Sequence, residues 1–203
     1  MSFDVTLARI AELQSVLAPP QARPAAAANA NGAAFASALQ GTMTAGPAAS
    51  TSWNAGGTGA GQALLNAVRG EVGVTEQPPG SNDAPRIAKY RQATAGSGVG
   101  PWCAYFTSWA AREAGVPLGD AGQGFGRVDD VWAWAERSGK AIPAAGAQPQ
   151  PGDLIVWDEY IGVVESVGAD GAISTIEGNS SDSVARRGYG ADGGGAIGYV
   201  RLG

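Results

Sequence analysis

The chain has 203 residues, with 13 Lys and Arg against 18 Asp and Glu, a formal net charge of −5, one Cys and no His. These counts exclude a Ser-His-Asp triad, a Cys-His dyad, an imidazole metal ligand and an intramolecular disulfide. The negative charge argues against nucleic acid binding, because clustered Lys and Arg are needed to neutralise phosphate. No apolar run approaches the roughly 20 residues of a membrane span. We expect neither a metal site nor a cofactor.

Residues 1–18 predict a short amphipathic helix that ends before two consecutive prolines, which cannot continue a helix. The segment is not typical of a signal peptide, because it lacks a positive start and charged residues interrupt its apolar character. Two interpretations remain open. Residues 3–17 form either a solvated, frayed helix or a docking helix for a protein partner, since isolated helices of this length are marginal in water.

Residues 19–60 are rich in Ala, Gly and Pro, and Arg23 is the only charged residue among them. Such a composition offers little apolar surface to offset the entropy of ordering, and predicts a flexible linker. We expect the folded domain to occupy residues 61–203, a common domain size.

The pattern within this domain predicts helices first and strands afterwards. Helices are expected at 62–70, 84–91, from 102 or 103 to 114, and 128–138. The proline-rich segment AIPAAGAQPQPGD is expected to be a loop, and strands are expected at 153–157, 160–167, 173–177 and 197–201. Asp170-Gly171 predicts a hairpin turn. This order indicates an α+β fold with helices packed on an antiparallel sheet.

The lone cysteine, Cys103, lies in GPWCAYFTSWAAREAG, where Gly and Pro place it at the start of a helix. Backbone N–H groups at a helix start favour a thiolate, so we expect a lowered cysteine pKa and a candidate nucleophile. On position alone, a small buried hydrophobic residue is the more common role of such a cysteine.

Four motifs change this balance: WCAYFTSWAAREAG, PGDLIVW, IGVVESV and IEGN occur in this order. Together they resemble the CHAP domain family, the cysteine, histidine-dependent amidohydrolases/peptidases, which are papain-like enzymes that cut peptidoglycan. The resemblance implies a papain-like fold, a peptidoglycan substrate and Cys103 as nucleophile. It implies supporting roles for Glu177 and Asn179. Because these two residues lie two apart on an expected strand, we expect them to face the same side. Less specifically, it implies that the approach to the cleft, where substrate binds, includes Asn82, Tyr90 and Trp102.

One position departs from the family pattern, because Tyr160 stands where the family histidine precedes an I-G-V-V run. The reference pKa of Tyr is about 10, so at neutral pH it is a poor base for a thiol. Asp158 and Glu159 are nearby carboxylates that could serve only if the loop bends, since Glu159 would face away on a regular strand. We therefore expect amide hydrolysis to be absent or severely reduced.

Two functions stay open at this stage. The first is a peptidoglycan hydrolase by descent, an N-acetylmuramoyl-L-alanine amidase or a peptide-bridge endopeptidase, impaired by the missing histidine. The second is a pseudoenzyme that binds the cell wall or a protein partner. A single sequence does not separate a natural Tyr160 from an introduced one.

We expect an exported or wall-associated protein without a classical signal peptide. ARIAELQSVL followed by AAFASAL resembles the leaders of hydrolases associated with bacterial flagellar assembly. That resemblance implies export through the flagellar channel, and release by cell lysis is the alternative.

Overall fold

The computed structural model describes residues 57–203, which belong to the unit Ser52–Gly203. The predicted amphipathic helix at 1–18 and nearly all of the predicted linker at 19–60 lie outside the described residues. The first described element, α3, begins at Gly59, two residues before the expected start of the domain.

Four helices precede the sheet in the described chain, and all four were predicted within three residues at either end. Their bounds are α3 Gly59–Arg69, α4 Pro85–Arg91, α5 Cys103–Glu113 and α6 Val128–Arg137. Helix α3 starts earlier than expected because the Thr58 hydroxyl caps it, accepting the N–H of Gly61 at 3.0 Å. Helix α5 ends before Gly115, which has φ 76°, a conformation that glycine adopts readily.

The sheet has six strands in the order β1-β6-β2-β3-β4-β5, and every pairing is antiparallel. The strands are β1 Ala141–Pro143, β2 Leu154–Val156, β3 Ile161–Val167, β4 Ile173–Glu177, β5 Ala185–Tyr189 and β6 Gly198–Val200. The predicted hairpin is confirmed between β3 and β4, where Gly171 has φ 82° and Gly168 donates its N–H to Ala172 O at 2.8 Å. The α+β prediction is likewise confirmed.

The two outermost strands were not predicted. Strand β1 lies within the proline-rich segment expected to be a loop, so that expectation is wrong for its first residues. Pro143 is tolerated because β1 is an edge strand that pairs only with β6. Strand β5, with the sequence ARRGY, lacks an apolar face and forms the other edge by pairing with β4.

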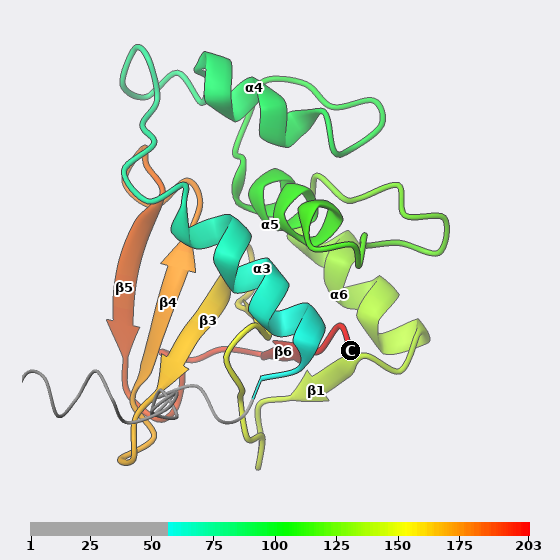
Figure 1. Cartoon of the computed structure of the whole chain (residues 1–203), viewed down its shortest axis with the longest axis vertical. Coiled ribbons are helices and arrows are strands. Elements are labelled where there is room, and N and C mark those ends of the chain that lie inside the picture. The colour runs from blue at the N-terminus through cyan, green and yellow to red at the C-terminus, as the bar shows by residue number, and fades with distance from the viewer. Residues whose placement is uncertain (1–56) are drawn as a thin grey trace, which may run out of the picture. The chain divides into compact units, whose positions relative to one another are not determined.

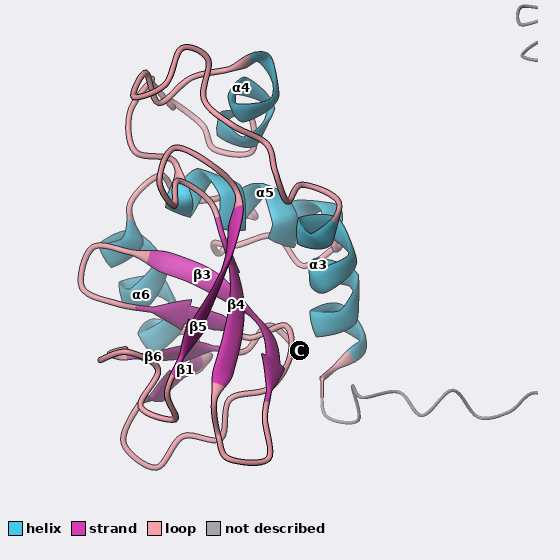
Figure 2. Cartoon of the chain, turned by 90° about the vertical axis from the view of Figure 1, so that its left-hand side faces the viewer, coloured by secondary structure: helices cyan, strands magenta, loops and turns pink. Residues whose placement is uncertain are grey.

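The helices cover one face of the sheet (Figure 1). Leu154 and Val156 of β2 face the main core with the helices, whereas Ile155 faces a smaller cluster on the other side. This alternation is the period of two that a buried strand requires. Figure 2 shows the twist of the sheet.

Helix α5 is the element that links the helices to the sheet, and it contacts α3, α4, α6 and β3. Phe106, Trp109 and Ala110 form the buried face expected from their spacing. Phe106 and Trp109 also pack against Tyr90 of α4. Because α5 is held on several sides, its first residue, Cys103, has a defined place beside the sheet.

Candidate active site

Cys103 is the first residue of α5, as predicted, and its side chain is 5 % exposed. It lies at the wall of a pocket of about 420 Å³. Other residues that line this pocket are Gly98, Val99, Gly100, Pro101, Tyr105, Gly126, Arg127, Val128, Asp129 and Glu159. A partly covered thiol at a helix start, facing a pocket, is suitably placed for a cysteine nucleophile.

The expected lowering of the Cys103 pKa is wrong, because the pKa of this thiol is raised. Burial is the main cause, and the negative charge of Glu177 adds to it. Backbone N–H groups of Ala104 and Ile161 act in the opposite direction, as expected at a helix start, but they do not outweigh burial. In this state the resting thiol holds its proton at neutral pH.

Tyr160 directly precedes β3, and its side chain packs against the core cluster that contains Cys103. Its hydroxyl donates a hydrogen bond to the carbonyl oxygen of Gly178 at 3.0 Å. Burial, followed by the charge of Glu177, raises the pKa of Tyr160 well above its ordinary value of 10. The phenol is thus a hydrogen-bond donor to the backbone. At neutral pH it forms the basic phenolate even less often than a solvent-exposed tyrosine does.

Glu177 is the last residue of β4 and is 1 % exposed. Its Oε1 accepts hydrogen bonds from the hydroxyls of Thr175 at 2.7 Å and Tyr189 at 2.8 Å. Residue 162 is glycine, and this leaves room for the Glu177 side chain. A Cβ at position 162 would lie 2.8 Å from Glu177 Cγ, which is too close. The carboxylate is therefore buried among neutral donors, close enough for its charge to act on both Tyr160 and Cys103.

Asn179 does not share the surroundings of Glu177, so the expected common side of the strand is wrong. The alternation ends because β4 stops at Glu177 and Asn179 has φ 60°. Its Oδ1 accepts the backbone N–H of Trp102 at 3.2 Å, and its Nδ2 donates to Glu76 at 3.0 Å. Asn179 therefore contacts the start of α5 and a residue that the sequence did not single out.

The three residues expected at the approach to the cleft lie in different places. Trp102 and Tyr90 are fully buried, and their polar atoms donate to Glu76 and Glu71 respectively. Neither lines the Cys103 pocket in this arrangement. Asn82 is half-buried, and its backbone N–H donates to Glu76 at 2.7 Å. Substrate contact by these three residues stays a prediction.

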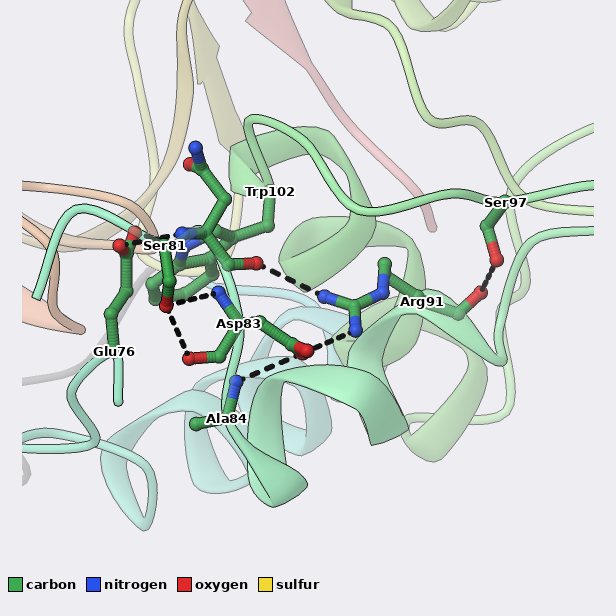
Figure 3. A network of polar contacts seen from close by, with 8 residues as sticks. Glu76, Ser81, Asp83, Ala84, Arg91, Ser97 and Trp102 are labelled. Atoms are coloured by element: carbon green, nitrogen blue, oxygen red, sulfur yellow. Dashed lines mark hydrogen bonds and ion pairs between the residues drawn. The ribbon is translucent and has the colours of Figure 1, made fainter. Parts of the chain in front are cut away.

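Glu76 is the polar residue that sequence reasoning missed. It is 3 % exposed and accepts hydrogen bonds from Trp102, Asn82 and Asn179. Figure 3 shows its side chain in the network that leads from Trp102 through the Ser81–Asp83 turn to Arg91. The neighbouring TEQPPGSND contains turn residues, but a carboxylate within such a segment is ordinarily solvated, so no local signal marked its burial.

Of the two carboxylates before Tyr160, Glu159 reaches the pocket that holds Cys103, whereas Asp158 does not line it. The expectation that Glu159 faces away assumed a regular strand. Instead β3 begins at Ile161, and residues 157–160 form a tight turn in which Trp157 donates its N–H to Tyr160 O at 2.8 Å. Within residues 57–203 no hydrogen bond or ion pair engages the Glu159 carboxylate, which is exposed at the pocket.

Two other features are absent from residues 57–203, namely a cluster of metal ligands and a membrane-spanning helix. No three His, Cys, Asp or Glu side chains there lie close enough together to hold a metal ion. None of the helices in this part of the chain is long and apolar enough to cross a membrane.

The family model of the CHAP domain matches residues 94–179. The search of curated proteins and the search of solved structures gave no match. The matched segment begins before α5 and ends at Asn179, and it includes Cys103, Tyr160 and Glu177. Glu76, Asn82 and Tyr90 lie before it. Residues 94–179, which include the thiol of Cys103 and the buried carboxylate of Glu177, are therefore similar to the CHAP domain family.

Proposed function

We propose that this chain is a peptidoglycan-directed CHAP module of the amidase or endopeptidase type in which hydrolysis by Cys103 is absent or severely reduced. CHAP domains are amidohydrolases and peptidases that act on peptidoglycan, which provides the substrate class. One observation carries the reduced activity. The group beside the candidate nucleophile is the phenol of Tyr160, whose hydroxyl donates a hydrogen bond to Gly178 O at 3.0 Å.

Amide hydrolysis by a thiol needs a base that takes the thiol proton and an acid that protonates the leaving amine. Because burial raises the Cys103 pKa above its ordinary value, the thiol is protonated at neutral pH. Tyr160 cannot remove that proton at neutral pH. Its raised pKa keeps the side chain as the neutral phenol, which still carries its own proton. Carboxylates such as Glu159 are far weaker bases toward a thiol than an imidazole is.

The second candidate is a pseudoenzyme that binds peptidoglycan, or a protein partner, through the same pocket. It is favoured by the combination of a pocket of about 420 Å³ beside Cys103 and a chain without histidine. A pocket that has kept its shape can still select a ligand when its chemistry is lost. Descent favours the first candidate, and the chemistry of residues 103 and 160 favours the second.

The deciding experiment measures release of soluble fragments from purified peptidoglycan by the unaltered protein, with Cys103→Ala as the matched control. Low release that disappears in Cys103→Ala supports a weak cysteine hydrolase. Absence of release from both, with co-sedimentation of both with the sacculi, supports the binding module. If the protein neither releases fragments nor co-sediments with the sacculi, both proposals are contradicted.

The fragments themselves would identify the bond cut by an active enzyme. New amino termini without new reducing sugars indicate amide cleavage, and their masses separate the N-acetylmuramoyl-L-alanine bond from a peptide bridge. The balance of the reaction is simple hydrolysis: the amide C–N bond breaks, water supplies the carboxyl oxygen, and the amine leaves with a proton.

The family match supports association with the cell wall. We further propose that residues 3–17 dock on a protein partner and that the chain leaves the cell through the flagellar export channel, with release by lysis as the alternative. Secretion of the full chain, compared in cells with and without a functional flagellar export channel, tests that route. Equal secretion by both would contradict it and leave lysis as the route of release.

A further inference from the structure

The start of α5 is held by a buried carboxylate that no motif marked. Glu76 Oε1 accepts from Trp102 Nε1 at 2.8 Å and from Asn179 Nδ2 at 3.0 Å. Its Oε2 accepts the backbone N–H of Asn82 at 2.7 Å. All three donors are neutral, and among residues 57–203 no Arg or Lys forms an ion pair with Glu76. Through these bonds Glu76 joins the loop at Asn82, the start of α5 and the segment after β4.

The hydrogen bonds of Glu76 and Asn179 hold Trp102, the residue before Cys103, at two atoms. The indole of Trp102 bonds directly to Glu76, and the backbone N–H of Trp102 bonds to Asn179, which is itself held by Glu76. Trp102 is the N-cap of α5, and no side-chain hydrogen bond of its own caps the helix. The direction in which α5 begins, and with it the direction of the Cys103 side chain, therefore depends on these contacts.

The loops that supply the partners are held in uncommon backbone conformations. Asn82 has φ 54° and Asn179 has φ 60°, and their side chains approach each other at 3.4 Å. Asparagine tolerates this region better than most residues, yet such conformations cost free energy and persist where surrounding contacts enforce them. Glu76 bonds to both residues, so it contributes to holding both conformations.

We propose that Glu76 is a positioning residue for Cys103: through Trp102 and Asn179 it fixes the start of α5 and holds the thiol covered at the pocket wall. The inference rests on the proposed function only in taking Cys103 as the reactive group of the site. Glu76 touches neither the pocket nor the thiol, so it acts entirely through its partners.

The test follows the reactivity of Cys103, which is the only thiol in the chain. The rate of alkylation by iodoacetamide is measured against pH for the unaltered full-length protein, Glu76→Gln, Glu76→Ala and Asn179→Ala. Burial is the main reason that the Cys103 pKa is raised, so loosening the start of α5 should expose the thiol and move the profile to lower pH. A shift of one pH unit corresponds to about tenfold faster alkylation below the midpoint.

We expect a graded response. Glu76→Gln keeps an oxygen for Trp102 and Asn179 but turns an amide donor toward the Asn82 N–H, so its shift should be the smaller one. Glu76→Ala and Asn179→Ala should shift the profile by about one unit or more. Because both act through one chain of contacts, Glu76→Gln combined with Asn179→Ala should alkylate no faster than Asn179→Ala alone, a non-additive result typical of coupled residues.

The matched control is Asp153→Asn, which alters a carboxylate that is also 3 % exposed but bonds to Arg201 and to Gln150 N–H. It should lower the free energy of unfolding without moving the alkylation profile. The proposal is overturned if Glu76→Gln and Asn179→Ala behave like this control, or if their effects add. If Glu76→Ala does not fold, Glu76→Gln and Asn179→Ala decide the matter. Failure of the proposed function would appear as absent binding to sacculi, and would leave these profiles unchanged.

Discussion

Buried and half-buried carboxylates occur in two regions of this domain, and their partners differ. Away from Cys103, each bonds to arginine: Glu71 to Arg86, Glu165 to Arg69 and Arg186, and Asp153 to Arg201. Around Cys103, Glu76 and Glu177 bond only to amide, indole, hydroxyl and backbone donors within residues 57–203.

The difference in partners gives the carboxylates of the two regions different effects on their surroundings. An arginine cancels the charge of a carboxylate locally, so the pair fixes neighbouring elements and has little effect beyond them. A carboxylate among neutral donors keeps its charge, which then acts on nearby titratable groups. Glu177 does so here, because it raises the pKa of both Tyr160 and Cys103.

The sharpest test of that comparison is Tyr160→His, which restores a group able to carry positive charge beside Glu177. We expect fragment release from peptidoglycan to rise by at least about 10²-fold, the usual size of general acid–base catalysis. The measurement is the initial rate of release, with Tyr160→His combined with Cys103→Ala as the control that should show none. No increase in a folded Tyr160→His protein would mean that the pocket no longer supports the chemistry.

The next largest effect should come from Glu177→Ala. The hydroxyls of Thr175 and Tyr189 would lose their acceptor in a buried site, so we expect a loss of about 1–3 kcal/mol in the free energy of unfolding. The same change removes a charge that raises the Cys103 pKa, so the alkylation profile should move to lower pH. Denaturant unfolding and iodoacetamide kinetics measure the two effects, and an unchanged profile would show that the charge does not reach the thiol.

The arginine-paired region should respond to acid. Burial by itself would raise the pKa of Glu71, but hydrogen bonds and charge from Arg86, with a hydrogen bond from Tyr90, lower it below the ordinary 4.5. A folded-state pKa below the unfolded one stabilises the fold fully above about pH 4.5, and this contribution is lost as pH falls through the folded value. Unfolding between pH 6 and pH 3 should therefore be less pH-dependent in Glu71→Gln. Equal slopes in the two proteins would contradict this assignment.

The smallest effect is expected for Arg186→Ala at the β5 edge. Arg186 bonds to Glu165 at 2.7 Å, but its side chain is half exposed and Glu165 keeps Arg69 as a second partner. Exposed pairs of this kind contribute about 0.2–1 kcal/mol. Denaturant unfolding at low and high salt measures the loss, which should shrink as salt screens the pair. A loss above about 2 kcal/mol would mean that Arg186 has a role beyond this exposed pair.

Much of the fold was predictable because the signals are local. The spacing of Phe106, Trp109 and Ala110 marks the buried face of α5, and Asp170-Gly171 marks the hairpin between β3 and β4. The two edge strands were missed because ARRGY has no apolar alternation and AIP is followed by turn residues. Both become strands by pairing with a neighbour, which is a property of the assembled sheet.

The amino-acid sequence by itself determined that the chain has a thiol at a helix start, no histidine, and tyrosine at the position before IGVV. Residue identity and local spacing suffice for these statements. Only the tertiary structure decided that the thiol pKa is raised, that Glu177 and Asn179 have separate partners, and that Glu76 holds the start of α5. Burial, charge and hydrogen bonding are set by groups distant in sequence: Asn179 Nδ2 meets Glu76 across 103 positions of the chain.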